Sequence, residues 1–128
     1  MVNRINPPGL AKPTGYAHVV EARGGRTRYV SGQVALGPDG KIVGDGDLAA
    51  QTRQVFENLK TALGAANATL DDIVKITVFV TDVGQLQAFR DVRNRYLPRA
   101  VPASSLVEVA RLVRPELMIE IEAVAVVE

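Results

Sequence analysis

Two segments of this chain are apolar on both faces of a strand, and this limits the folds that the chain can adopt. Residues Ile73–Val80 are apolar at almost every position, Lys75 and Thr77 excepted, and Ala123–Val127 is apolar throughout. A sheet with one face in water should instead alternate apolar and polar residues. Only two segments have helical periodicity, enough to cover one face of such a sheet. We therefore expect a second copy of the protein to cover the other face.

The composition excludes several kinds of site. The 128 residues include no cysteine and one histidine, His18, which excludes a disulfide framework, a thiolate nucleophile, a cysteine zinc site and a histidine metal cluster. The net charge is only +1, with 15 Lys and Arg against 14 Asp and Glu. This balance gives no indication of a nucleic-acid partner. The length suits one domain, residues 1–128.

No segment indicates a membrane or a secretion signal. A membrane-spanning helix needs about 18–20 consecutive apolar residues, and no run in the sequence approaches this length. Residues 1–13 contain three prolines and no long apolar core, so we expect an extended N-terminal arm rather than a signal peptide. We expect a cytoplasmic protein with no membrane partner.

The expected elements alternate as in an α+β fold: two strands, a helix, a strand, a second helix and two strands. Tyr16–Ala22 and Thr27–Gln33 are predicted to pair as a hairpin across the turn residues Gly24 and Gly25. Further strands are expected at Ile73–Thr81, Ser104–Val109 and Met118–Val127, with a short one at Ile42 and Val43.

Two helices are expected, each with a start or stop signal. The first covers Leu48–Ala65, where Asp47 is the expected N-cap and Asn67 the left-handed residue that closes the helix. The second covers Val83–Leu97 and is ended by Pro98.

Two carboxylates stand within the last, otherwise apolar strand. Glu120 and Glu122 alternate with isoleucines, so they share one face of the strand, roughly 7 Å apart. One interpretation is a general base or acid with a raised pKa. The other is a pair of glutamates that face solvent or pair with arginines, and the spacing alone favours this second interpretation.

Two weaker signals lie near the start of the chain. A glycine at a strand end, as in Ser31-Gly32, lets a ligand approach the backbone, but it also suits a simple turn. His18 shares a face with Tyr16, and a lone histidine is more often a hydrogen-bonded structural residue than a catalyst.

A set of short motifs runs in order along most of the chain. They are Tyr16, Tyr29–Gln33, Gln51–Thr52 with Val55, Asn58 and Leu59, Asp72–Val80 with Asp82, Pro102–Ala103, Val107–Leu112 and Ile119–Ala123. No one motif is specific, but the ordered set resembles the RidA/YjgF family of reactive-intermediate deaminases, also labelled L-PSP endoribonuclease. The resemblance extends from Tyr16 to Val126.

The resemblance implies a chorismate-mutase-like α+β fold in a homotrimer. In such a trimer the sheets form a central barrel, the helices lie outside on one face of each sheet, and small-molecule ligands bind in clefts between subunits. The deaminases of the family hydrolyse enamines and imines to a keto acid and ammonia, without a metal or cofactor.

The resemblance also implies roles for individual residues. Glu120 matches the glutamate that handles the attacking water, while Tyr16 and the backbone near Ser31 and Gly32 match the wall of the site. The family arginine that pairs with the substrate carboxylate is replaced by Ser104.

Two further positions differ from the usual site. Leu106 stands where many members have a cysteine, and Arg90 replaces an asparagine. Arg90 is the first candidate for a substitute cation, and without the usual arginine we expect poor turnover of 2-aminoacrylate.

Three functions remain open at this stage. The first is an enamine or imine hydrolase with an altered substrate, supported by the intact Glu120 motif. The second is a non-catalytic trimer that binds a small molecule, supported by the missing arginine. The third, an endoribonuclease, ranks last because a net charge of +1, three Tyr and three Phe offer little for RNA binding.

Overall fold

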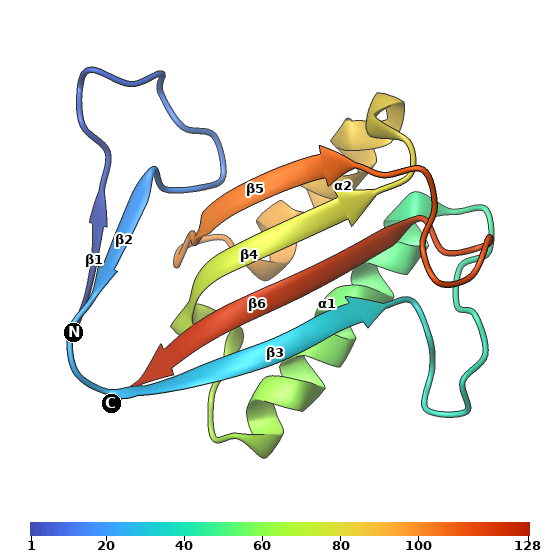
Figure 1. Ribbon diagram of the computed structural model, residues 1–128, viewed down its shortest axis with the longest axis horizontal. Helices are drawn as coiled ribbons and strands as arrows, with labels where there is room; N and C mark the ends of the chain where they lie inside the picture. Colours follow the sequence, from blue (N-terminus) through green and yellow to red (C-terminus); the bar gives the residue numbers. More distant parts are fainter.

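Six strands form two sheets of unequal size, and two α-helices pack on one side of the larger sheet (Figure 1). The computed structural model describes residues 1–128. The strands are β1 (Val2–Ile5), β2 (Val19–Ala22), β3 (Arg26–Val34), β4 (Ile73–Val80), β5 (Ala103–Glu108) and β6 (Ile119–Val127). The helices are α1 (Leu48–Ala65) and α2 (Leu86–Tyr96), with short 3₁₀ turns η1 (Leu70–Asp72) and η2 (Val83–Gln85). The larger sheet has the order β3-β6-β4-β5, in which only β4 and β5 are parallel. This confirms the predicted α+β class.

The first helix forms where the sequence predicts it, because its ends are marked chemically. The Asp47 carboxylate accepts a hydrogen bond from the Ala50 N–H at 3.0 Å, which satisfies one of the free amides of the first turn. Beyond the last turn, Asn67 adopts a φ of 58°, the left-handed conformation that ends the helix.

The core fills the space between the helices and one face of the larger sheet. Its fully buried side chains include Phe56 and Leu59 from α1, Phe89 from α2, Ile76 from β4 and Ile121 from β6. These side chains come from every element that touches the core, so burial of apolar area holds the two layers together.

The opposite face of the sheet is covered by no part of the chain (Figure 1). We call it the open face; cross-strand neighbours on it include Tyr29 beside Val124, Thr77 beside Glu122, and Phe79 beside Glu120 and Val107. Tyr29 is 83% exposed and Val107 46%. The open face therefore carries the apolar side chains that the sequence predicts, but it also carries polar ones, Thr77, Glu120 and Glu122.

The predicted hairpin between Tyr16–Ala22 and Thr27–Gln33 is wrong. Strand β2 pairs instead with β1, and β3 pairs with β6 over most of its length. Gly24 and Gly25 do turn the chain, with φ values of 65° and 77°, but they lead it away from β2. A long strand gains more ladder hydrogen bonds from nine-residue β6 than from four-residue β2. The arm expected over residues 1–13 thus contains a strand, β1.

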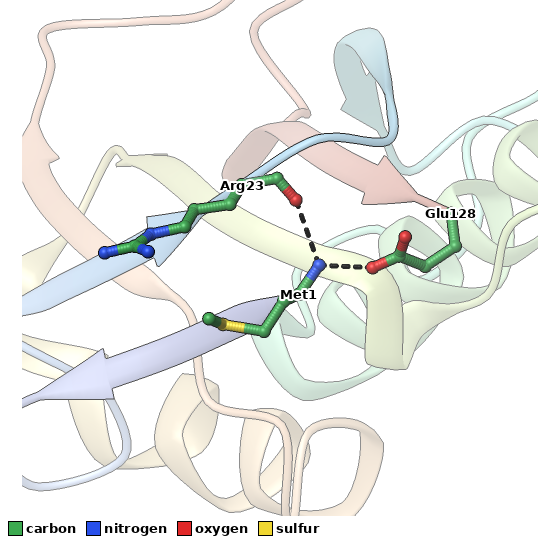
Figure 2. A network of polar contacts seen from close by, with 3 residues as sticks. All are labelled: Met1, Arg23 and Glu128. Carbon is green, nitrogen blue, oxygen red and sulfur yellow. Dashed lines mark hydrogen bonds and ion pairs between the residues drawn. The ribbon is translucent and has the colours of Figure 1, made fainter.

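The start and end of the chain meet beside this small sheet. Figure 2 shows the Met1 amine between the Arg23 carbonyl, to which it donates at 3.0 Å, and the Glu128 carboxylate, with which it forms an ion pair. The amine holds the pKa of the Glu128 carboxyl below its usual value, by hydrogen bonding and by charge. These contacts join β1 to the end of β6.

Two smaller expectations also change. Ile42 makes only an isolated bridge to Leu36, because the segment between two turns is too short for a strand. The second helix is split into η2 and α2, and Asp82 caps η2 by accepting from the Gly84 N–H at 2.9 Å. Gln51 is fully buried, and its amide bonds the backbone of Glu116 and Met118. No helix is long and apolar enough to cross a membrane.

Candidate active site

A cavity of about 350 Å³ lies between α2 and the outer strand β5. Its size is typical of a small-molecule site. Three segments contribute its walls: the loop before β2, the helical segment η2–α2, and β5. The lining residues are Thr14, Tyr16, Val83, Leu86, Phe89, Arg90, Arg93, Ser104 and Leu106. Four of the seven site residues predicted from the sequence are therefore brought together here.

Tyr16 reaches the cavity because the loop that carries it is attached to the start of β5. The Ala17 N–H donates to the Pro102 carbonyl at 2.9 Å, and Ala17 forms a bridge with Ala103. His18 supports the same loop: its backbone N–H donates to Asn6 Oδ1 at 2.8 Å, and its Nε2 lies 2.6 Å from the Ala11 carbonyl oxygen. The His18 ring meets the Tyr16 ring edge-on at 5.4 Å. The structural interpretation of His18 is confirmed.

Ser104 and Leu106 enter the cavity because of the register of β5. Ser104 stands opposite Ile76 and Leu106 opposite Val78. Both partners on β4 are buried core residues, so Ser104 and Leu106 point to the helix side of the sheet. The strand thus offers the cavity one hydroxyl and one apolar side chain.

Two arginines from α2 complete the lining. Arg90 is exposed, whereas Arg93 is only 8% exposed. Burial, and then the positive charge of Arg90, hold the pKa of the Arg93 guanidinium below its usual value. No aspartate or glutamate lines the cavity, so it presents two cations and no counter-ion.

The other three predicted residues lie elsewhere in the chain. Glu120 is on the open face, half-buried, beside Gly32 of β3. A Cβ added at Gly32 would stand 2.1 Å from Glu120 Oε2, so glycine is required for the carboxylate to lie against this backbone. Ser31 is exposed next to it. Neither Glu120 nor the exposed Glu122 forms an ion pair within the chain.

The candidate site is therefore divided between two faces of one sheet. The helix side holds Tyr16, Arg90, Ser104 and Leu106 around a cavity, and the open face holds the Glu120 group. No group of three or more His, Asp or Glu side chains is placed to hold a metal ion.

The sequence analysis missed one lining residue, Arg93. A signal for it exists in the helical spacing: Leu86, Phe89 and Arg93 follow one another at three and four residues, so the arginine falls on the apolar stripe of α2. A charge in such a stripe indicates either a buried ion pair or a ligand site.

Comparison with known proteins gives one consistent family. Residues 9–127 match the family described as endoribonuclease L-PSP. A RutC family protein of Pyrococcus horikoshii is 37% identical over 115 residues, which is 89% of each chain.

Solved structures give the same result. A protein of the conserved Rid family from Yersinia pestis has a TM-score of 0.92 and 40% identity, covering 98% of both chains. RidA from an Antarctic Psychrobacter has a TM-score of 0.75 and 31% identity, covering 91% of this chain and 92% of that one. These matches cover both the cavity and the open face.

Proposed function

The chain belongs to the RidA/YjgF family, also described as endoribonuclease L-PSP, and we propose that it is a trimeric cytoplasmic hydrolase of small enamines or imines. One observation carries the proposal. The binding groups lie around a cavity on the helix side of the sheet, whereas the carboxylate that would activate water lies on the open face. Neither group is a complete site, and two copies of the chain can supply one of each.

The chemistry that such a site would perform needs few groups. The carbon of an imine is already electrophilic, so water adds to it once both are held in place. Glu120 would accept a proton from the attacking water and return it to the nitrogen, which leaves as ammonia. Tyr16 and Ser104 would hold the substrate through their hydroxyls, and the backbone at Ser31 and Gly32 would form the facing wall.

The trimer in this proposal is supported by the open face. Apolar side chains on it have no cover within the chain, and Tyr29 and Val107 are among the exposed large hydrophobic residues. A patch of this kind on a sheet is typical of an interface between subunits. Burial of Glu120 at a subunit boundary would also keep bulk water away from it.

A second candidate, binding without catalysis, is favoured by a different observation. The nine residues around the cavity include no carboxylate and no imidazole, and therefore no general base. If the Glu120 of a neighbouring copy does not reach the cavity, the protein would sequester or sense a metabolite. RNA cleavage ranks below both candidates, because the net charge of +1 gives little attraction for a phosphate backbone.

Ammonia release separates these candidates. The purified protein is added to a panel of imines generated freshly by an amino-acid oxidase, and the rate of ammonia formation is compared with spontaneous hydrolysis. The proposal predicts acceleration of at least one imine, with 2-aminoacrylate among the poor substrates. No acceleration of any imine, together with tight binding of a keto acid, would favour the binding protein instead.

A further inference from the structure

The buried guanidinium of Arg93 has no counter-ion in the chain. Its Nε and Nη2 both donate to Asn94 Oδ1, at 3.3 and 3.1 Å, and its Cζ lies 5.5 Å from the centre of the Phe89 ring. The three ion pairs of the structure involve other residues. A cation withdrawn from water without a carboxylate partner is unfavourable, so the position of this side chain needs another explanation.

A neighbouring charge adds to this cost. Arg90 is three residues before Arg93 on α2, and like charges at this spacing lie close together on a helix and repel each other. Both side chains line the same cavity. An anion bound there would offset the repulsion and the loss of solvation together.

The Arg93 guanidinium lies against the backbone of Gly15. This residue has a φ of 75°, and a Cβ added to it would stand 2.1 Å from Arg93 Nη2 and 2.4 Å from Cζ. The guanidinium therefore occupies the space that a side chain at position 15 would take. It lies against this backbone at the cavity wall instead of extending into water.

The rest of the cavity is suited to a small anion with an apolar body. Tyr16 and Ser104 supply hydroxyl groups that make no side-chain hydrogen bond within the chain, and the remaining surface is largely apolar, with Leu86 and Leu106 on facing elements.

We propose that Arg93, with Arg90 beside it, binds the carboxylate of the ligand of this cavity, and that the apolar part of the ligand packs against Leu86 and Leu106. That this ligand is the substrate of a hydrolase rests on the proposed function; the carboxylate site does not. A planar guanidinium can pair with both carboxylate oxygens. Ser104 carries no charge, so α2 supplies the cation that β5 lacks.

The reaction leaves the carboxylate unchanged. Water adds to the C=N carbon, the C–N bond breaks, and R–C(=NH)–COO⁻ with H₂O gives R–C(=O)–COO⁻ with NH₃. Arg93 is thus a binding residue, and the R group would pack against Leu86 and Leu106.

Calorimetric titration of the full chain with 4-methyl-2-oxopentanoate, an oxo acid that such a reaction would release, tests the carboxylate site. Arg93→Gln should weaken binding by about tenfold or more, since charge-assisted contacts are lost. Arg90→Gln should weaken it by about threefold, because an exposed charge contributes less. Arg95→Gln is the matched control: it removes one charge from an exposed position of α2 outside the cavity lining and should change the affinity by less than about twofold.

A second variant keeps the charge but removes the planar guanidinium. Arg93→Lys should weaken binding less than Arg93→Gln does, because an ammonium still attracts the carboxylate but cannot pair with both of its oxygens through two parallel donors. Thermal unfolding of each variant shows whether it is folded. Pyruvate should bind more weakly than the branched oxo acid, and the uncharged amide of the oxo acid should bind more weakly than the acid.

Three results would overturn the assignment: unchanged affinity in Arg93→Gln, equal losses in Arg93→Gln and Arg95→Gln, or displacement of the oxo acid by an equal concentration of inorganic phosphate. Ammonia release is measured in parallel. Arg93-dependent binding without any ammonia release would reject the hydrolase and retain the carboxylate site, whereas ammonia release that is insensitive to Arg93→Gln would reject the site and retain the hydrolase.

Discussion

The two faces of the larger sheet differ in the groups that they offer to the proposed reaction. The helix side has a cavity with two cations, two hydroxyls and no acidic group. The open face has the half-buried carboxylate of Glu120 beside Gly32, in a region with exposed apolar side chains. The proposed binding groups and the proposed proton-transfer group are therefore separated by the thickness of the sheet.

The comparison shows that the two faces lack different partners. On the helix side, Arg93 lacks a charge partner inside an otherwise packed region, which indicates a small ligand. On the open face, exposed large hydrophobic side chains lie on both outer strands of the sheet, Tyr29 on β3 and Val107 on β5, as is typical of a subunit interface. A site that uses both faces has to be completed by a second copy of the chain.

The largest expected effect is on the carboxylate of the open face. Glu120→Gln keeps the shape of the side chain but cannot accept a proton, so turnover of the best imine should fall by about a hundredfold or more. Glu122→Gln is the matched control on the same strand and should retain most activity. Ammonia formation measures both, and equal losses in the two variants would contradict the role of Glu120.

The next largest effect should be on the oligomeric state, and only a substitution on the open face should change it. Tyr29→Lys places a charge in the proposed interface and should convert the trimer largely to monomer at micromolar concentration. Val113→Lys changes a side chain of similar exposure, 80% against 83%, in the loop before β6 and should leave the trimer intact. Light scattering gives the two masses; a wild-type monomer would disprove the interface itself.

The smallest expected effect is on stability, at the cavity. Arg93→Met keeps the apolar stem but removes a buried, unpaired cation beside Arg90. Without ligand its free energy of unfolding should be unchanged or higher by up to about 1 kcal/mol, as measured by urea titration at matched protein concentration. A loss of more than about 1 kcal/mol would show that Arg93 is a structural residue rather than one held for a ligand.

Much of the fold is predictable from local signals, and the errors have a common cause. Helix α1 has the predicted bounds because periodicity, the Asp47 cap and Asn67 all indicate them. The hairpin was mispredicted because Gly24 and Gly25 specify a turn but not the partner of the strand that follows. Partner choice depends on the length and register of β6, nearly a hundred residues later in the chain.

Part of the candidate site follows from the sequence. Tyr16, Arg90, Ser104 and Leu106 line one cavity, and the sequence groups them because the motifs around them resemble those of the family, although three of the four residues differ from it. The sequence analysis missed Arg93 although this residue falls on the apolar stripe of α2; its contact with Gly15, far away in the sequence, appears only in the structure. Alternation along β3 does not predict the faces of Ser31 and Gly32, because a bulge shifts the register of this strand between Val30 and Gln33.

Subunit mixing tests the central claim, that one site takes its binding and proton-transfer groups from two copies. Glu120→Gln and Arg93→Gln proteins, each impaired alone, are unfolded together in equal amounts, refolded and assayed for ammonia release. Random assembly would give a neighbouring pair with both residues intact at about one site in four, and so about a quarter of wild-type activity. Activity no higher than that of the two variants refolded separately would show that both residues act from the same chain and would contradict the account.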